Sequence, residues 1–317
     1  MPINPTPIEK EDRPNDQKRT FGEGDRRTVK FLMEQPRYSF SDIILHERTM
    51  QEIEDAMAVF RFQEKLFVEW KLGSVIKSPS NICMNFYGEP GTGKTMAANA
   101  VAAQLELPIL RVNYAEIESK YVGETSKNLT KMFDTAVREN ALLLFDEADA
   151  LLSRRVTDMS NATDVSVNQT RSVLLTLLDG FSGIVVFTTN FISNYDPAFM
   201  RRIPYHIYFP LPDERGRLAL LQHYLSETVP NQVNFAQVVK KYEGISGADI
   251  ANATLIAALK VARAGEKFMA QTDFEYALER VLTSKRDNSK KRVITEEREV
   301  SEEYAISQIK KTGGDLK

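Results

Sequence analysis

Gly88-Glu89-Pro90-Gly91-Thr92-Gly93-Lys94-Thr95 is the stretch that decides how this chain is expected to fold. It follows a short apolar run, residues 82–87, and precedes residues 96–105, whose composition favours a helix. Between a strand and a helix, glycines let backbone N–H groups converge on an anion, and the positive end of the helix dipole points at the same place. Lys94 adds a positive charge for the outer phosphates, and the Thr95 hydroxyl can ligate Mg²⁺. The stretch therefore predicts a nucleotide-binding loop.

Length and composition limit the kind of protein. The chain has 317 residues, enough for one large domain or two modest ones with a sizeable core. Lys and Arg number 41 against 44 Asp and Glu, so no strong basic field points to nucleic acid as the main partner. The polar N-terminus is unlike a signal peptide, and no apolar run approaches the roughly 20 residues of a membrane span. We therefore expect a soluble, cytoplasmic protein.

Four segments of different character divide the chain. Residues 1–37 combine prolines with many charges and are expected to form a flexible tail. In residues 38–211 strand and helix signals alternate, which indicates a mostly parallel sheet covered by helices on both faces, with ligands at the carboxyl ends of its strands. Residues 212–283 have only helical signals and predict a small second unit. Residues 284–317 are dense in charges of both signs and are expected to form a charged C-terminal tail.

Hydrophobic periodicity predicts the individual elements within these segments. Strands are expected at 82–87, 109–112, 141–145, 184–188 and 207–209. One or two packed helices are expected at 47–70, and further helices at 96–105, 128–139, 173–178, 213–228, 235–242, 247–264 and 272–282. The fold class is therefore α/β, followed by an all-α unit.

Two adjacent carboxylates end the apolar strand expected at 141–145. Ending a buried strand on two acids costs free energy unless the acids have a cation or a task. Asp146 can hold Mg²⁺ beside the phosphates, and Glu147 can polarise the water that attacks the γ-phosphate. A solvated pair of acids at a strand end is the simpler alternative. Together with the glycine-rich loop, the two acids favour a site that hydrolyses a nucleoside triphosphate.

Polar residues also follow the strand expected at 184–188. Asn190 can orient an attacking water without repelling the phosphates, although asparagine is also a common turn residue. Arg201 and Arg202 come later, and an arginine suits the charge that develops on a transferring phosphoryl group, even when a neighbouring subunit supplies it. Taken alone, two adjacent arginines are commonly part of an exposed surface.

Four motifs occur in a fixed order, namely residues 88–95, the sequence Leu-Leu-Leu-Phe-Asp-Glu-Ala-Asp at 142–149, Thr188-Thr189-Asn190, and residues 196–202. This set resembles the AAA-family ATPases of the AAA+ superfamily, over about residues 38–283. The resemblance implies a P-loop NTPase parallel sheet sandwiched by helices, followed by a small helical lid. It also implies ATP and Mg²⁺ at the junction of the two, and a ring that is usually a hexamer.

The resemblance implies roles for individual residues. It gives water activation to Glu147, the first sensor position to Asn190, and the arginine fingers that reach the next protomer to Arg201 and Arg202. It gives Mg²⁺ binding to Thr95 and Asp146. The ATP-binding set that it implies consists of Ile43, Gly88, Glu89, Pro90, Gly91, Thr92, Gly93, Lys94, Thr95, Met96, Asp146, Gly247 and Ala248.

Two further matches concern the subgroup. Lys120-Tyr121-Val122 resembles the first pore loop of members that thread polypeptides, in which an aromatic residue grips the substrate. A buried Tyr–Val packing pair is the alternative at this position. The adjacent Arg201 and Arg202 look like those of single-ring ATPases such as spastin, katanin and the mitochondrial membrane-protein extractors.

Three functions are compatible with these motifs. The leading hypothesis is a homo-oligomeric, hexameric ring that hydrolyses ATP to thread, unfold or disassemble a protein partner, such as a HORMA-domain protein, although no motif selects that partner. A DNA-acting loader or initiator is disfavoured by the acidic composition, and nucleic acid is not expected as a partner. The third hypothesis is a nucleotide-gated scaffold that binds ATP and a partner without threading.

Overall fold

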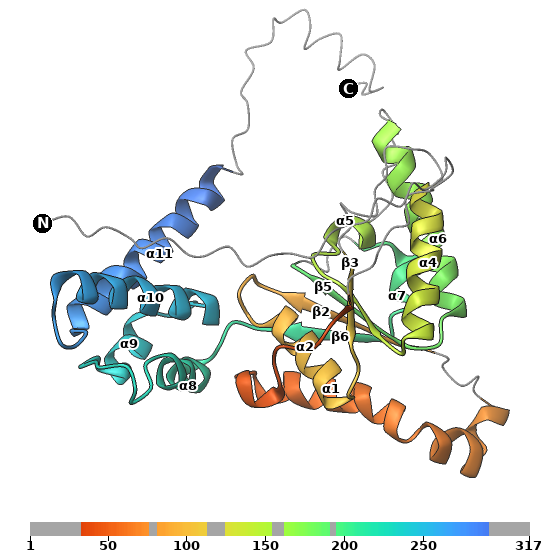
Figure 1. The fold of residues 1–317 in the computed structure, drawn as a ribbon, viewed down its shortest axis with the longest axis horizontal. Helices are drawn as coiled ribbons and strands as arrows, with labels where there is room; N and C mark the ends of the chain where they lie inside the picture. Colours follow the sequence, from red (N-terminus) through yellow and green to blue (C-terminus); the bar gives the residue numbers. More distant parts are fainter. Residues whose placement is uncertain (1–32, 76–80, 113–123, 154–161, 191–194, 292–317) are drawn as a thin grey trace, which may run out of the picture. The chain divides into compact units, whose positions relative to one another are not determined.

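The computed structural model describes residues 33–75, 81–112, 124–153, 162–190 and 195–291 (Figure 1). Within these residues, six strands form one sheet in the order β1-β3-β4-β5-β2-β6. Strand β1 pairs antiparallel with β3, and the other neighbouring strands pair in parallel. The expected α/β fold with a mostly parallel sheet is confirmed. The strands are β1 (Met33–Glu34), β2 (Ile82–Gly88), β3 (Ile109–Val112), β4 (Leu142–Phe145), β5 (Ile184–Thr189) and β6 (Tyr205–Phe209).

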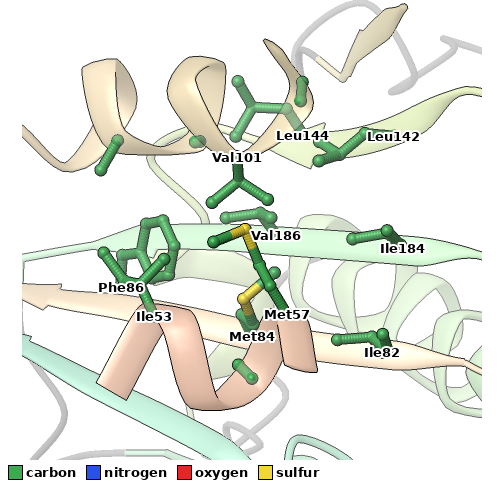
Figure 2. Close-up of a cluster of buried hydrophobic side chains, with 14 of the residues drawn as sticks. Ile53, Met57, Ile82, Met84, Phe86, Val101, Leu142, Leu144, Ile184 and Val186 are labelled. Carbon is green, nitrogen blue, oxygen red and sulfur yellow. The ribbon is translucent and has the colours of Figure 1, made fainter. Parts of the chain in front are cut away.

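Helices α1 (Glu47–Arg61) and α2 (Lys94–Gln104) cover one face of the sheet. Every second residue of β2, beginning at Ile82, points into this layer, as the two-residue period of a strand requires. Figure 2 shows Met57 of α1 and Val101 of α2 meeting the side chains of the central strands. This layer is the main core of the α/β part.

The opposite face of the sheet is covered by α4 (Glu124–Arg138) and α6 (Ala162–Gly180), as Figure 1 shows. Phe133 of α4 contacts Phe145 of β4, with ring centroids 6.3 Å apart, and Phe145 stacks on Phe187 of β5 at 4.8 Å. All four residues of β4 are buried. A strand covered on both faces has to be apolar throughout, which is why the run at 142–145 is continuous rather than alternating. Short helices α5 (Asp149–Leu152) and α7 (Pro197–Met200) follow β4 and β5.

The residues after β6 form a helical lid with its own core. It contains α8 (Glu214–Tyr224), α9 (Phe235–Lys241), α10 (Gly247–Ala264) and α11 (Gln271–Lys291). Helix α10 begins at a capping box, in which the Ser246 hydroxyl accepts from the Asp249 N–H and the Asp249 carboxylate accepts from the Ser246 N–H. The helix ends at Gly265, which has a φ of +71°. These local signals explain why α10 has the bounds expected from the sequence.

Both ends of the folded part reach further than expected. Met33 and Glu34 pair with β3, although they lie inside the predicted tail. Helix α11 continues to Lys291, and the Lys285 ammonium donates to the Asp249 carboxylate at 2.9 Å. The predicted tails at 1–37 and 284–317 are therefore too long at these two boundaries, because long-range contacts hold residues that have little apolar character.

Residues 47–70, expected to form one or two packed helices, are helical in two parts, but the second part is largely exposed. Helix α1 ends at Arg61 and is followed by a π-helical turn, Lys65–Glu69, and a 3-10 turn, Leu72–Ser74. Another 3-10 turn, Phe40–Asp42, precedes α1. Trp70, expected in a packed helix, is 65% exposed. Among the described residues, no helix is both long and apolar enough to cross a membrane.

Gly88 and Gly244 both have a positive φ, and comparing them separates the cost of backbone strain from the cost of overpacking. Gly88 has a φ of +143°, and an added Cβ would lie 2.2 Å from the Phe209 carbonyl oxygen; Gly244 has a φ of +70°, but an added Cβ would meet nothing within 4 Å. We expect Gly244→Ala to lower the free energy of unfolding by about 1 kcal/mol through backbone strain, and Gly88→Ala to lower it by about 3 kcal/mol, because overpacking is added. Urea unfolding followed by circular dichroism measures both. Equal losses would contradict the role assigned to the contact with Phe209.

Candidate nucleotide-binding site

A cavity of about 880 Å³ lies beside the glycine-rich loop. Its wall also includes the ends of β4 and β5, the segment before α1, and parts of α8 and α10. This is the carboxyl edge of the parallel strands, where α/β sheets bind their ligands. The predicted site residues that line the cavity are Ile43, Pro90, Gly91, Thr92, Gly93, Lys94, Thr95, Met96, Asp146, Glu147, Asn190, Gly247 and Ala248.

Gly91 brings the loop against the lid. Its φ is +80°, and an added Cβ would lie 2.7 Å from the Ser246 Oγ and 2.8 Å from the Ala248 Cβ. The Ala248 N–H donates to the Gly91 carbonyl at 3.2 Å. The N-terminal ends of α2 and α10 both meet the cavity, and both favour an anion there.

Lys94 lies at the first position of α2 and is 8% exposed. Its ammonium donates to the carbonyls of Gly88 at 2.7 Å and Glu89 at 2.9 Å, and to the Asn190 Oδ1 at 3.2 Å. Burial lowers the pKa of Lys94, and nearby carboxylates, Asp149 foremost, oppose this lowering. The ammonium is thus held by uncharged oxygen atoms that a phosphate can replace. Gly88 and Glu89 contribute these carbonyls but are not among the residues that line the cavity.

Asp146 lies just beyond the end of β4 and is partly buried. Its Oδ1 accepts from the Thr95 hydroxyl at 2.8 Å and from the Thr188 hydroxyl at 2.6 Å, while its Oδ2 accepts from the Arg111 guanidinium at 3.0 Å. A carboxylate and a hydroxyl that already touch are oxygen ligands of the kind that Mg²⁺ requires. The donor set at Asp146 and Thr95 therefore fits a magnesium ion.

Glu147 is exposed at the cavity and has a φ of +54°. Its N–H donates to the Thr188 hydroxyl at 3.1 Å. A left-handed backbone is unfavourable for a residue with a side chain, and such strain is concentrated at functional sites. Asn190 lies nearby at the end of β5, and its N–H donates to the Asp149 Oδ1 at 3.0 Å. The structure therefore brings Lys94, Glu147 and Asn190 to one cavity.

The two predicted arginines lie outside this cavity and differ from one another. The Arg202 guanidinium makes two hydrogen bonds of 2.8 Å to the Asp179 carboxylate at the end of α6, and another to the Ala198 carbonyl. The Arg201 side chain is exposed and has no hydrogen-bond or ion-pair partner among the described residues. Lys120, Tyr121 and Val122 lie outside the described residues.

Sequence reasoning missed several residues at the site. Thr188 was quoted within the motif Thr188-Thr189-Asn190 but was given no role of its own, yet its hydroxyl contacts both Asp146 and Glu147. Arg111 carried no signal of its own, because its contact with Asp146 depends on β3 lying beside β4. His223 and Tyr224 of α8 also line the cavity. Asp149 was visible as a further acid in the motif at 142–149, and its hydrogen bond to Asn190 gives it a positioning role.

Comparison with known proteins shows which proteins this chain is similar to. Residues 84–211 match the AAA family, described as "ATPase family associated with various cellular activities (AAA)". The chain is 33% identical over 260 residues to a protein named probable 26S proteasome regulatory subunit 10B of Caenorhabditis elegans, covering 80% of this chain and 62% of that protein. It is 31% identical over 265 residues to a proteasome-activating nucleotidase of Saccharolobus islandicus, covering 81% of this chain and 65% of that protein.

A third relative is the ATP-dependent zinc metalloprotease FtsH of Acidothermus cellulolyticus. The chain is 32% identical to it over 276 residues, which cover 84% of this chain and 40% of that protein. The chain thus spans less than two thirds of the length of each of these relatives. Residues 84–211 of this chain are thus similar to the ATPase domain of the AAA family, whose members use ATP with Mg²⁺.

Proposed function

We propose that this chain forms a hexameric ring that hydrolyses ATP to thread, unfold or disassemble a protein partner. One observation carries the proposal: Lys94, Asp146 and Glu147 share a cavity, whereas the exposed Arg201 of the same chain lies outside it. A complete site then takes its arginine from another copy. The names of the relatives refer to proteasomes and to a protease, which favours a protein as the substrate.

The chemistry follows from where the side chains lie. Lys94 would exchange its two loop carbonyls for the outer phosphates of ATP. Asn190 and Glu147 would hold the attacking water, and Glu147 would draw its proton away as the new P–O bond forms and the bond between the β- and γ-phosphates breaks. Thr95 and Asp146 would hold Mg²⁺, which when bound offsets phosphate charge. Arg201 of a neighbouring copy would stabilise the charge that develops in the transition state.

Sequence motifs favour a polypeptide as the partner but select no particular protein. Lys120-Tyr121-Val122 supports a loop that grips a polypeptide, and the adjacent Arg201 and Arg202 support the single-ring group that includes spastin and katanin. A dedicated protein partner, such as a HORMA-domain protein, is compatible with these features. In this scheme ATP hydrolysis at Lys94 is coupled to movement at Tyr121.

The first prediction concerns Glu147. We expect Glu147→Gln to slow phosphate release by about 10²–10³-fold, because the water loses its proton acceptor, and to bind a fluorescent ATP analogue with nearly unchanged affinity. Glu106→Gln is the matched control, since Glu106 is also an exposed glutamate with a positive φ, of 56°, but does not line the cavity. Turnover by Glu147→Gln at the rate of Glu106→Gln would contradict the assignment.

The second prediction separates the two arginines. We expect Arg201→Ala to lower kcat by about 10³-fold or more without changing the thermal midpoint. Arg202→Ala should lower kcat much less and cost about 1 kcal/mol of stability, because it breaks a partly exposed ion pair with Asp179.

A mixture tests whether Arg201 acts on a neighbouring copy. Arg201→Ala protomers keep Glu147, and Glu147→Gln protomers keep Arg201, so a mixed ring contains some complete sites. Mixing the two inactive variants should restore part of the hydrolysis. If no activity returns although both variants form mixed assemblies, Arg201 does not complete a neighbour's site.

The third prediction concerns threading. We expect Tyr121→Ala to keep basal hydrolysis within about twofold and to lose the stimulation that an unfolded polypeptide, casein, gives to the unmodified protein, because an aromatic side chain is needed for grip. Tyr276→Ala serves as control, since this lid tyrosine is 56% exposed. Retained stimulation in Tyr121→Ala would favour the scaffold hypothesis.

A further inference from the structure

A closed ring of hydrogen bonds joins Asn85 of β2, Thr189 of β5 and Tyr195, and of these three residues only Thr189 lines the cavity. The Thr189 hydroxyl donates to the Asn85 Oδ1 at 3.3 Å, the Asn85 amide donates to the Tyr195 hydroxyl at 3.3 Å, and the Tyr195 hydroxyl donates to the Thr189 Oγ1. All three side chains are buried, with at most 6% exposed. We name Asn85, Thr189, Tyr195 and the adjoining His206 the polar cluster.

His206 extends this ring toward β6. Residues Asn85 and His206 are directly paired across β2 and β6, and the Asn85 Nδ2 lies 3.4 Å from the His206 Nδ1. Burial lowers the pKa of His206, and the backbone carbonyls of Met200 and Ile203 lie near enough to oppose this lowering. The buried His206 Nε2 makes no hydrogen bond within the described part of the chain. His206 therefore faces the turn that carries Arg201 and Arg202.

Burying the polar cluster at this position costs free energy. Asn85 is fully buried, and two neighbours on its face of the sheet, Cys83 of β2 and Phe187 of β5, are buried and apolar. An uncharged polar group in such surroundings is tolerated only when it is hydrogen-bonded. An apolar residue would fill this place in the strand more simply. The closed ring formed by Asn85, Thr189 and Tyr195 holds these three side chains in one relative arrangement, because each of them both donates and accepts a hydrogen bond within it.

The cluster joins two parts of the hydrolytic machinery. Thr189 immediately precedes Asn190, which lines the cavity. Tyr195 immediately precedes Asp196, which caps α7, and the Arg201 N–H donates to the carbonyl of Pro197 in that helix. The ring of hydrogen bonds thus clamps together the two ends of the connection from β5 to α7.

We propose that Asn85, Tyr195 and His206 are positioning residues for ATP hydrolysis, which fix the Arg201 turn against the end of β5. The inference rests on the proposed function, because it assumes that Arg201 serves a neighbouring site. A small displacement of a positioned group can cost up to about 10²-fold in rate even when the altered residue is remote from the reacting atoms. A purely structural cluster would instead affect stability alone.

The test removes one hydroxyl. Tyr195→Phe deletes the donor to Thr189 and the acceptor of Asn85 while keeping the ring that fills the core. Tyr205→Phe is the matched control, because Tyr205 is a half-buried tyrosine near the same turn whose hydroxyl makes no hydrogen bond with the described residues. We expect Tyr195→Phe to lower kcat about tenfold, with KM and ADP affinity within about twofold of the unmodified protein. Tyr205→Phe should leave kcat, KM and ADP affinity unchanged. Equal kcat values in the two variants would overturn the proposal.

Mixed assemblies then locate the defect. In a mixture of Arg201→Ala and Glu147→Gln protomers, only the Glu147→Gln protomer supplies the arginine of an active site. Adding Tyr195→Phe to that protomer should lower the recovered rate about tenfold, whereas adding it to the Arg201→Ala protomer should have little effect. The reverse pattern would overturn the proposal. If the parent mixture recovers no activity, the proposed trans arrangement fails; if it recovers and Tyr195→Phe has no effect in either protomer, only the positioning role fails.

Discussion

The carboxylate of Asp146 holds three separate elements at one point. It accepts from Thr95 at the start of α2, from Thr188 on β5 and from Arg111 on β3. A charged group at the end of a strand buried on both faces is tolerated because these donors replace its water. The same contacts require β3 and β5 to flank β4 and require α2 to begin beside it. The contacts of Asp146 therefore fix both the arrangement of the site and the order of the central strands.

The parts of the fold that were predicted from the sequence are those determined by residues close together in the chain. The glycine-rich loop has its strand before it and its helix after it, and α10 has the predicted bounds because a capping box and a terminal glycine mark its ends. The parts that were missed have causes distant in the chain. β1 exists because β3 offers an open edge. Residues 62–70 have helical periodicity, but in the structure most of their side chains, including that of Trp70, are exposed.

The site shows the same division between local and distant causes. Lys94, Asp146, Glu147 and Asn190 were identified by motif and do line one cavity. The sequence could not distinguish Arg201 from Arg202, because the difference lies in Asp179 at the end of another helix. Asn85 interrupts an otherwise apolar run, which is a visible signal. Its partners became apparent only when β2, β5 and β6 were placed side by side.

The close contact of Gly91 with the lid has a consequence for how this sequence can change over time. Position 91 must admit a positive φ and must also leave room for Ser246 and Ala248. A larger residue at position 248, or any side chain at position 91, would push the phosphate loop and the lid apart. Substitutions at these positions are therefore not independent of one another. Substitutions there are expected to arise as compensating sets. Positions in the phosphate loop and in the lid are thus expected to covary during evolution, although more than 150 residues of chain lie between them.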